Sequence, residues 1–475
     1  MTKRHPWLRL LLLCPLVIGT AGLLADHRAV ADALYMSTQM YVLNFSGTPA
    51  NLLVELARWT APLATAGSIL LVISILNQKA AARIRTLLTD TVAVYGPEED
   101  AARLLSQLGA RGIRGTDMLL PARNYILLGK QEDSFAFYEA NRRALEKVPV
   151  YLRCDTLPAQ SVSPINLHLF QPMEIEARLF WKAGSLLEAA DEKDGQLNIV
   201  FVGFGRPGEE LLHWGLQYNV FSPRQRICYH IFADASDFLA AHPMLDQIGD
   251  PVLAYDDRWQ AHLPVLMNAD LILVTPCGLE RALETTVYQL LSLVPEKQIT
   301  VFADSGTVLS MLDEQERLRI IDVPAQALQV GNIMESDLLR SAMRVNLRYA
   351  HLYGGVAETE ENARAEWAKL SAFLRYSNIS SADYHEIRRL MIRRMGGSPD
   401  GSGLTGEQRE LLAELEHMRW CRYHWLNNWR CGVPEDGKAK DAARHIHADL
   451  IPYRELTEAE KEKDRTTIGV MLGLQ

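Results

Sequence analysis

The sequence has 475 residues, of which 48% are hydrophobic and 23% charged, and its formal net charge is −9. This composition is typical of a globular protein of about three domains, since a domain takes roughly 100 to 200 residues. The acidic balance gives no reason to expect a nucleic acid as partner. The six cysteines form no C-x-x-C pair, which favours free thiols in a reducing compartment over a disulfide framework.

Two uncharged runs lie near the N-terminus, at residues 10–25 and 61–76. Each is slightly shorter than the ~20 residues that span a bilayer, but Trp7 and Trp59 at their edges extend them. They predict two transmembrane helices, at about residues 7–25 and 60–77, in a region that ends near residue 85.

Basic residues precede the first run and follow the second, at Lys3, Arg4, Lys79, Arg83 and Arg85. The positive-inside rule therefore predicts a multi-pass protein of the cell inner membrane with cytoplasmic N- and C-termini. Two alternatives stay open. The first run is a cleaved signal peptide, with a processing site at residues 29–31, or the second run is a buried core helix.

A first Rossmann-like half is expected over residues 86–190. Runs of β-forming residues alternate with helical patterns, at 91–95, 124–128 and 148–152, and a helix at 174–180 closes the half. The turn after the first run reads G-P-E-E from Gly96. Because two carboxylates stand where a phosphate would bind, we predict that this half is degenerate and structural.

A second, nucleotide-binding half is expected over residues 191–355. The stretch LNIVFVGFGRPGEE, residues 197–210, reads as a strand, a glycine turn and a helix start. Such glycines allow a tight turn, close approach of backbone amides to a phosphate, and packing of helix on strand. A second apolar run, 227–232, leads to Asp234, where this type of fold places the carboxylate that holds a ribose hydroxyl.

These features predict a site for NAD or another adenine nucleotide, formed by Gly203, Phe204, Gly205, Arg206, Gly208, Asp234 and Thr275. Further strands at 269–275 and 298–303, separated by a helical pattern at 282–293, favour a doubly wound parallel α/β sheet. The alternative is the same fold with an ordinary tight turn and no ligand, because fold does not fix function.

Between the two N-terminal runs, residues 31–46 are too apolar for a solvated loop and too short to span a bilayer. A helix, a re-entrant segment, a second helix and tandem Rossmann-like halves resemble a two-transmembrane potassium channel with TrkA-N (RCK-type) regulatory domains. This resemblance implies a pore-like segment at Tyr41, Val42, Asn44 and Gly47, and a homo-oligomer, dimer or tetramer. The chain lacks the T-V-G-Y-G filter of such channels, so potassium selectivity does not carry over.

The C-terminal region, residues 356–475, is expected to be mostly α-helical. It contains a linker-like segment at residues 396–406, and the pattern described next follows this segment. Its pattern resembles a ryanodine-receptor-type (RyR) repeat domain, through Glu414, His417, Trp420, Trp429, Gly432, His447, Leu450, Pro452, Tyr453, Leu456 and residues 460–465. The resemblance implies a ligand or partner site, which we place at His417, Arg419, Trp420, Trp429 and Tyr453.

Catalytic signatures such as G-x-S-x-G, H-E-x-x-H and a P-loop are absent from the sequence, so no catalytic residue is assigned. The spacing of Cys421, His424 and Cys431 fits no zinc template, and no metal is expected. The turn 304–306 is read as a ligand turn. The leading interpretation is a membrane-bound ligand sensor or ligand-gated, channel-like protein. A membrane-tethered NAD-dependent enzyme and a non-conducting signalling scaffold are the alternatives.

Overall fold

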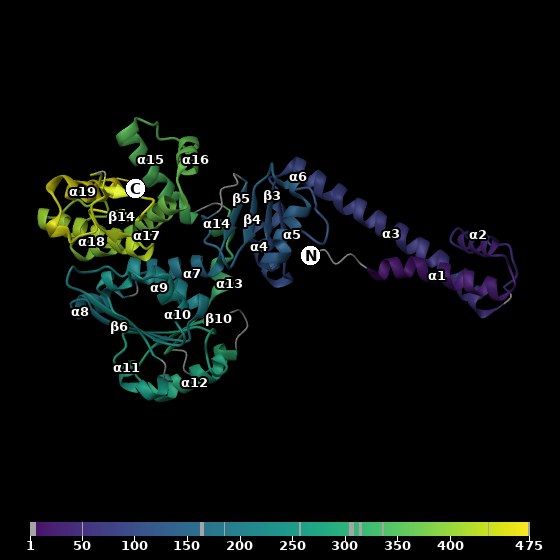
Figure 1. The fold of residues 1–475 in the computed structure, drawn as a ribbon, viewed down its shortest axis with the longest axis horizontal. Coiled ribbons are helices and arrows are strands. Elements are labelled where there is room, and N and C mark those ends of the chain that lie inside the picture. Colours follow the sequence, from purple (N-terminus) through teal and green to yellow (C-terminus); the bar gives the residue numbers. More distant parts are fainter. Residues whose placement is uncertain are drawn as a thin grey trace. The chain divides into compact units, whose positions relative to one another are not determined.

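The computed structural model describes residues 6–473 apart from 50, 162–165, 185, 256–257, 304–307, 313–315, 335–336 and 436. The chain divides into two compact units, Met1–Arg153 and Cys154–Gln475 (Figure 1). Each unit contains parallel strands and helices.

The first unit begins with three helices, α1 (Pro6–Ala25), α2 (Val30–Met40) and α3 (Leu52–Leu88). Both α1 and α2 pack against α3, around a small core formed by Leu23, Ala33, Met40, Val54, Ala57 and Ala61. The Asn51 side chain fixes the start of α3, because its Oδ1 accepts from the Val54 amide at 3.1 Å and its Nδ2 donates to the Gly22 carbonyl at 2.7 Å. Large apolar side chains such as Leu63 and Leu76 stay exposed on α3.

The prediction of membrane-spanning helices is wrong for the part of the chain that the structure describes, where no helix is both long and apolar enough to cross a membrane. The second apolar run is not a separate span, because it is the middle of the 37-residue helix α3, which carries Glu55 and Arg58 before the run and Arg85 after it. The first run contains Pro15 inside α1.

The predictions of a re-entrant segment and of a multi-pass inner-membrane topology depended on the two spans and are therefore also wrong. Residues 31–46 instead form α2 and the turns after it, with α2 packed against both α1 and α3. Lys3 and Arg4, on which the predicted orientation depended, lie outside the described residues.

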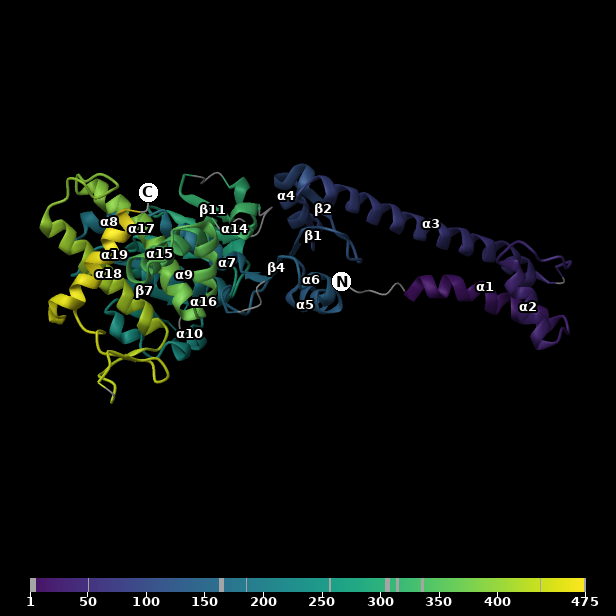
Figure 2. The same ribbon diagram turned by 90° about the horizontal axis from the view of Figure 1, so that it is seen from above.

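After α3, the first unit contains a parallel sheet. Its strands β1 (Val92–Tyr95), β2 (Gly112–Arg114), β3 (Asn124–Leu127) and β4 (Val150–Arg153) lie in the order β2-β1-β3-β4. Figure 2 labels β1, β2 and β4 of this sheet. The connections contain α4 (Glu98–Leu108), η1 (Gly109–Arg111), α5 (Gln131–Ala140) and α6 (Arg142–Leu145). All four residues of β1 are buried, as expected for the central strand of a parallel sheet.

The second unit begins with β5 (Leu167–Phe170), α7 (Pro172–Lys182) and α8 (Leu187–Glu192), and then forms the larger sheet. Its six parallel strands are β6 (Gln196–Val202), β7 (Arg226–Phe232), β8 (Val252–Ala254), β9 (Leu271–Val274), β10 (Ile299–Ala303) and β11 (Leu318–Asp322). Their order, β11-β10-β9-β6-β7-β8, is the 3-2-1-4-5-6 arrangement of dinucleotide-binding folds. The predicted parallel α/β sheet is therefore present.

Alternate side chains of β6 serve two cores. Ile199 and Phe201 pack with α9 (Gly205–Tyr218), whereas Val200 and Val202 pack with α11 (Leu263–Met267) and α12 (Leu283–Leu293). The two groups of helices cover opposite faces of the sheet, which makes the sheet doubly wound (Figure 1).

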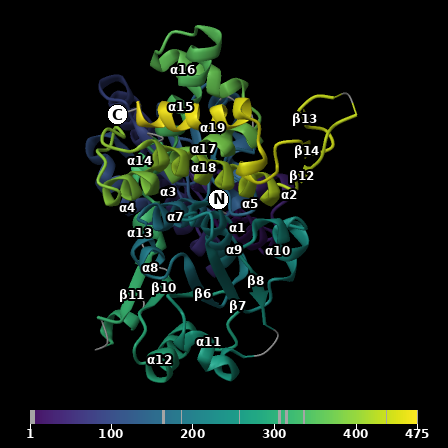
Figure 3. The same ribbon diagram turned by 90° about the vertical axis from the view of Figure 1, so that its left-hand side faces the viewer.

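Shorter elements complete the α/β part, namely α10 (Ser236–Ala241), η2 (Leu245–Ile248), η3 (Trp259–His262), η4 (Val308–Met311), α13 (Val323–Ala327) and α14 (Val330–Ile333). A helical region follows, with α15 (Asp337–Gly354), α16 (Glu360–Lys369), α17 (Ala372–Arg394), α18 (Gly406–Leu426) and α19 (Glu458–Leu472). Between α18 and α19 lie η5 (Tyr453–Glu455) and a small sheet of β12 (Arg430–Cys431), β13 (Lys440–Asp441) and β14 (Ile446–His447). Figure 3 shows α17 and α18 stacked on α7 and α9, on the side of the large sheet away from α12.

Candidate functional site

The glycine turn lies at the carboxyl end of β6, where the strand order reverses between β6 and β9. Ligands bind at such reversal points in open α/β sheets. Gly203 and Gly205 have positive φ values of 78° and 52°, which only glycine adopts without strain. Thr275 Oγ1 donates to the Phe204 carbonyl at 3.1 Å. The structure therefore places Gly203, Phe204, Gly205 and Thr275 next to one another.

The loop after β9 lies directly on this turn. The Phe204 amide donates to the Cys277 carbonyl at 2.8 Å. A Cβ added at Gly205 would lie 2.5 Å from Cys277 Cβ, and one at Gly203 would lie 2.4 Å from the Thr275 carbonyl oxygen. A Cβ at Gly208 would lie 2.4 Å from the Phe204 ring. Each of the three glycines thus has a close protein neighbour.

Arg206, at the start of α9, is engaged by two carboxylates of its own helix. Its guanidinium lies 3.5 Å from Glu209 and 3.0 Å from Glu210. Gln171 Nε2 also donates to Glu210 Oε1 at 3.2 Å. Burial raises the pKa of Glu210 to about 7, because desolvation disfavours the charged carboxylate.

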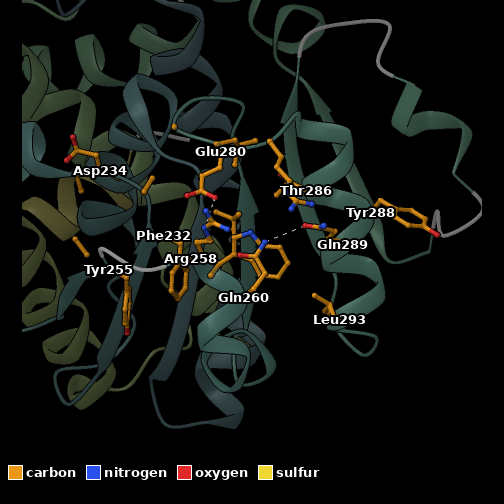
Figure 4. Close-up of a pocket in the computed structure, with 18 of the residues that line it drawn as sticks. Phe232, Asp234, Tyr255, Arg258, Gln260, Glu280, Thr286, Tyr288, Gln289 and Leu293 are labelled. Carbon is orange, nitrogen blue, oxygen red and sulfur yellow. Dashed lines mark hydrogen bonds and ion pairs between the residues drawn. The ribbon is translucent and has the colours of Figure 1, made fainter.

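A cavity of about 870 Å³ opens beside the turn, at the carboxyl ends of β6, β7 and β8 and against the loop after β9 (Figure 4). Its volume is that of a small-molecule site. It is lined by Val202, Phe232, Ala233, Asp234, Ala235, Ser236, Leu239, Ala254, Tyr255, Arg258, Trp259, Gln260, Gly278, Leu279, Glu280, Arg281, Thr286, Tyr288, Gln289, Ser292 and Leu293. Residues 203–208 do not line this cavity, whereas Asp234 does.

Asp234 follows β7 and is held by the start of α10. Its Oδ1 accepts from the Ser236 amide at 2.9 Å, and this hydrogen bond lowers the pKa of the Asp234 carboxyl. The side chain is exposed, so it stays ionised and open to a ligand hydroxyl at neutral pH.

Aromatic rings form one wall of the cavity. Phe232 and Tyr255 stack with ring centroids 4.5 Å apart and an interplanar angle of 20°. A flat apolar wall of this kind suits a planar base. Across from it, α12 supplies the buried Thr286 and the amide side chain of Gln289.

Two polar contacts link parts of the cavity rim (Figure 4). Arg258 Nε lies 3.0 Å from Glu280 Oε2, with both side chains more than half exposed. Gln260 Nε2 donates to Gln289 Oε1 at 3.4 Å. Exposed ion pairs contribute about 0 to 1 kcal/mol, so a ligand can displace the first contact at little cost.

The last residues of α10 and the residue after it touch the end of α18. His242 Nδ1 lies 2.7 Å from the Leu426 carbonyl, and Asn428 Nδ2 donates to the Ala241 carbonyl at 3.0 Å. The other end of α10, at Ser236, lines the cavity. One short helix therefore separates the cavity from the C-terminal helical region.

The residues predicted as the C-terminal ligand site are mostly enclosed. Arg419 is buried, and its guanidinium binds both carboxylate oxygens of Glu416, at 3.0 and 2.7 Å, and Ser380 Oγ at 2.9 Å. His417 is buried with Nδ1 3.2 Å from Asp464 Oδ2 and Nε2 2.9 Å from the Ile451 carbonyl. Tyr453 Oη donates to Glu410 Oε1 at 2.9 Å.

Trp420 and Trp429 belong to a cluster of aromatic and histidine rings. Trp420 lies 4.0 Å from His424 and 4.9 Å from His447, centroid to centroid, and the ring of His445 stacks on Trp429 at 5.3 Å. Trp420 is half-buried and Trp429 is buried, so Trp420 is the most accessible of the five predicted residues. Among the described residues, no group of three His, Cys, Asp or Glu side chains is placed to hold a metal.

The predicted pore-like residues follow α2. Val42 and Asn44 are exposed, and Tyr41 and Gly47 are half-buried. Tyr41 accepts a hydrogen bond through its carbonyl from Thr65 Oγ1 at 3.0 Å, which attaches the turn to α3. The predicted ligand turn 304–306 lies outside the described residues.

Sequence reasoning did not find Tyr255, Arg258, Gln260 and Gln289. Tyr255 and Arg258 follow the strand β8, whose three apolar residues, Val252–Ala254, are too few to identify a strand from the sequence. Gln289 lies inside a helix that has no motif. The one available signal was the place of β8 in the sheet, because its carboxyl end must lie near those of β7 and β6.

Comparison with known proteins identifies one part of the chain. No curated protein and no solved structure matches the chain, and nothing supports the resemblance to potassium channels or to TrkA-N domains. The family model described as RyR domain matches residues 405–474, which run from the N-cap of α18 past the end of α19. The C-terminal part of the second unit is therefore an RyR domain.

Proposed function

We propose that the second unit is a ligand sensor that binds an adenine nucleotide in the cavity beside β7 and responds through its RyR domain. NAD is one candidate ligand. The observation that carries the proposal is the position of the cavity, at the carboxyl ends of parallel strands next to the strand-order reversal, with Asp234 on its wall.

The groups around the cavity match the parts of a nucleoside. The ionised carboxylate of Asp234 accepts hydrogen bonds from ribose hydroxyls. The stacked rings of Phe232 and Tyr255 offer an apolar wall to the base. The amide groups of Gln260 and Gln289 carry both donors and acceptors for the base edge.

Binding without chemical turnover is the function that these groups support. The Asp234 carboxyl has a lowered pKa, and a general base works best when its pKa lies near the working pH. Asp234 is therefore suited to hold a hydroxyl and poorly suited to remove its proton.

The RyR domain is the part that would respond to the ligand. Its helix α18 contacts the residues at the end of α10 through His242 and Asn428, and the start of α10 borders the proposed ribose position. A ligand that orders Asp234 and Ser236 can thus bias the position of α18. Such coupling changes affinities by a factor of roughly 5 to 150 and acts in both directions. A homo-oligomer, as expected from the sequence, stays a prediction.

Calorimetric titration of the full chain with AMP and with NAD tests the proposal. Asp234→Asn should weaken binding by about 10- to 150-fold, because a charge-assisted hydrogen bond is worth about 1.5 to 3 kcal/mol. Asp237→Asn is the matched control, since Asp237 is an exposed carboxylate in the first turn of α10, three residues after Asp234, and does not line the cavity. Absence of binding by the unmodified chain, or equal losses in the two variants, would contradict the proposal.

A further inference from the structure

The glycine turn does not line the cavity, so a ligand bound in the cavity gives this turn no function in binding. In dinucleotide-binding folds, the second glycine of such a turn leaves room for a diphosphate against the backbone. Here the room beside Gly205 is taken by the side chain of Cys277, whose Cβ and Sγ lie 2.5 and 3.5 Å from the position of an added Cβ. The missing side chain of Gly205 therefore accommodates the loop after β9.

The turn also offers few amide donors. The Phe204 amide is used by the Cys277 carbonyl, and the Gly208 amide donates to the Phe204 carbonyl at 3.1 Å. Pro207 has no N–H. Only the amides of Gly205 and Arg206 are then available to an anion at the start of α9. The start of a helix otherwise presents up to four unpaired donors.

Charge near the turn is also unfavourable for a diphosphate. Glu209 and Glu210 lie in the second turn of α9 and hold the Arg206 guanidinium at 3.5 and 3.0 Å. Phosphates placed there would compete with these two side chains for the Arg206 guanidinium.

We infer that the ligand is recognised through its nucleoside half, and that the glycine turn is a packing device for the loop after β9 and not a diphosphate site. This inference rests on the proposed function and narrows its ligand class to nucleosides and nucleotides whose phosphates lie outside the turn. The phosphates of a bound nucleotide then extend from the cavity toward solvent and add little to affinity.

A titration series with adenosine, AMP, ADP-ribose and NAD on the full chain tests the inference. The four ligands share the adenosine group and differ in the phosphates that a glycine turn would hold. Affinities for NAD and ADP-ribose within about tenfold of the adenosine affinity are expected, since tenfold corresponds to about 1.4 kcal/mol, less than one strong charge-assisted hydrogen bond.

Three variants refine the test. Arg206→Ala should leave the affinities for adenosine and for NAD unchanged, and so should Pro207→Ala, which restores an amide donor to the turn. Asp234→Asn should weaken both ligands by the same factor, because both carry the ribose that Asp234 holds.

The outcomes separate this inference from the proposal on which it rests. If NAD binds more than tenfold tighter than adenosine, or if Arg206→Ala weakens NAD alone, the turn holds phosphates and the inference fails while nucleotide binding stands. If none of the four ligands binds, the proposed function fails and the inference fails with it. Similar affinities for the four ligands, all weakened by the same factor in Asp234→Asn, support both the inference and the proposed function.

Discussion

Arg422 of the RyR helix α18 and Asp250 of the Rossmann-like part form a buried ion pair, with Nη2 2.7 Å from Oδ2 and side chains 2% and 1% exposed. Asp250 Oδ1 also accepts from the Ile227 amide at 2.8 Å, and Arg422 Nη1 donates to the Leu216 carbonyl at 3.0 Å. One pair thus joins α18 to the start of β7 and the end of α9. The RyR domain is part of the core of the second unit.

Replacement of Arg422 by Met should therefore destabilise the protein strongly. Removing one partner of a buried pair leaves an uncompensated charge and costs about 3 to 5 kcal/mol. Urea unfolding gives the value. Arg444→Met is the control, because Arg444 lies on the surface 3.1 Å from the exposed Glu435, and such pairs contribute about 0 to 1 kcal/mol. Similar losses of unfolding free energy in the two variants would show that Asp250 becomes hydrated when Arg422 is absent.

The stability of the protein should fall as the pH rises above neutrality, through His417. Burial lowers the pKa of this side chain, but hydrogen bonds to Asp464 and Cys421 outweigh that effect and raise it from 6.5 to about 10. The folded state therefore keeps a proton that the unfolded chain releases near pH 6.5. The stabilisation is complete below that pH and is lost between about pH 6.5 and 10.

Urea midpoints between pH 6 and 10 measure this dependence, with a slope of up to about 1.4 kcal/mol per pH unit from one proton. His417→Gln should be less stable at pH 6 and should show a flatter profile over the same range. A variant with the same slope as the unmodified protein would assign the pH dependence to other groups.

Gly205→Ala should destabilise the protein by about 1 to 3 kcal/mol, since it adds overpacking to a left-handed conformation that alanine disfavours. The added Cβ would lie 2.5 Å from Cys277 Cβ. Cys277→Gly removes that contact, so the double variant should recover part of the loss in thermal unfolding. Additive losses would mean that the two residues do not touch.

The sequence predicted the large sheet well because buried parallel strands are continuous apolar runs. The runs found at 199–202, 227–232, 269–275 and 298–303 correspond to β6, β7, β9 and β10. Apolar content alone also suggested membrane spans, and that prediction was wrong because it ignored that α3 continues well past its apolar middle on both sides.

The candidate site was predicted only in part. Asp234 lines the cavity, but the glycine pattern did not reveal that Cys277, distant in sequence, would fill the space beside Gly205. Contacts such as the buried pair of Arg178 and Asp383, 205 residues apart, leave no local pattern. Arg419 could have been recognised as structural, because Glu416 precedes it by three residues on the same helix.

Hydrogen exchange of the full chain with and without saturating AMP tests the central claim, that nucleotide in the cavity is sensed by the RyR domain. The account predicts slower exchange at Ser236, which borders the cavity, and also at Asn427 and Trp429, whose amides bond carbonyls at the end of α18. The change at both places should be at least about fivefold, the lower end of allosteric coupling. Protection at Ser236 with unchanged exchange at Asn427 and Trp429 would contradict the claim.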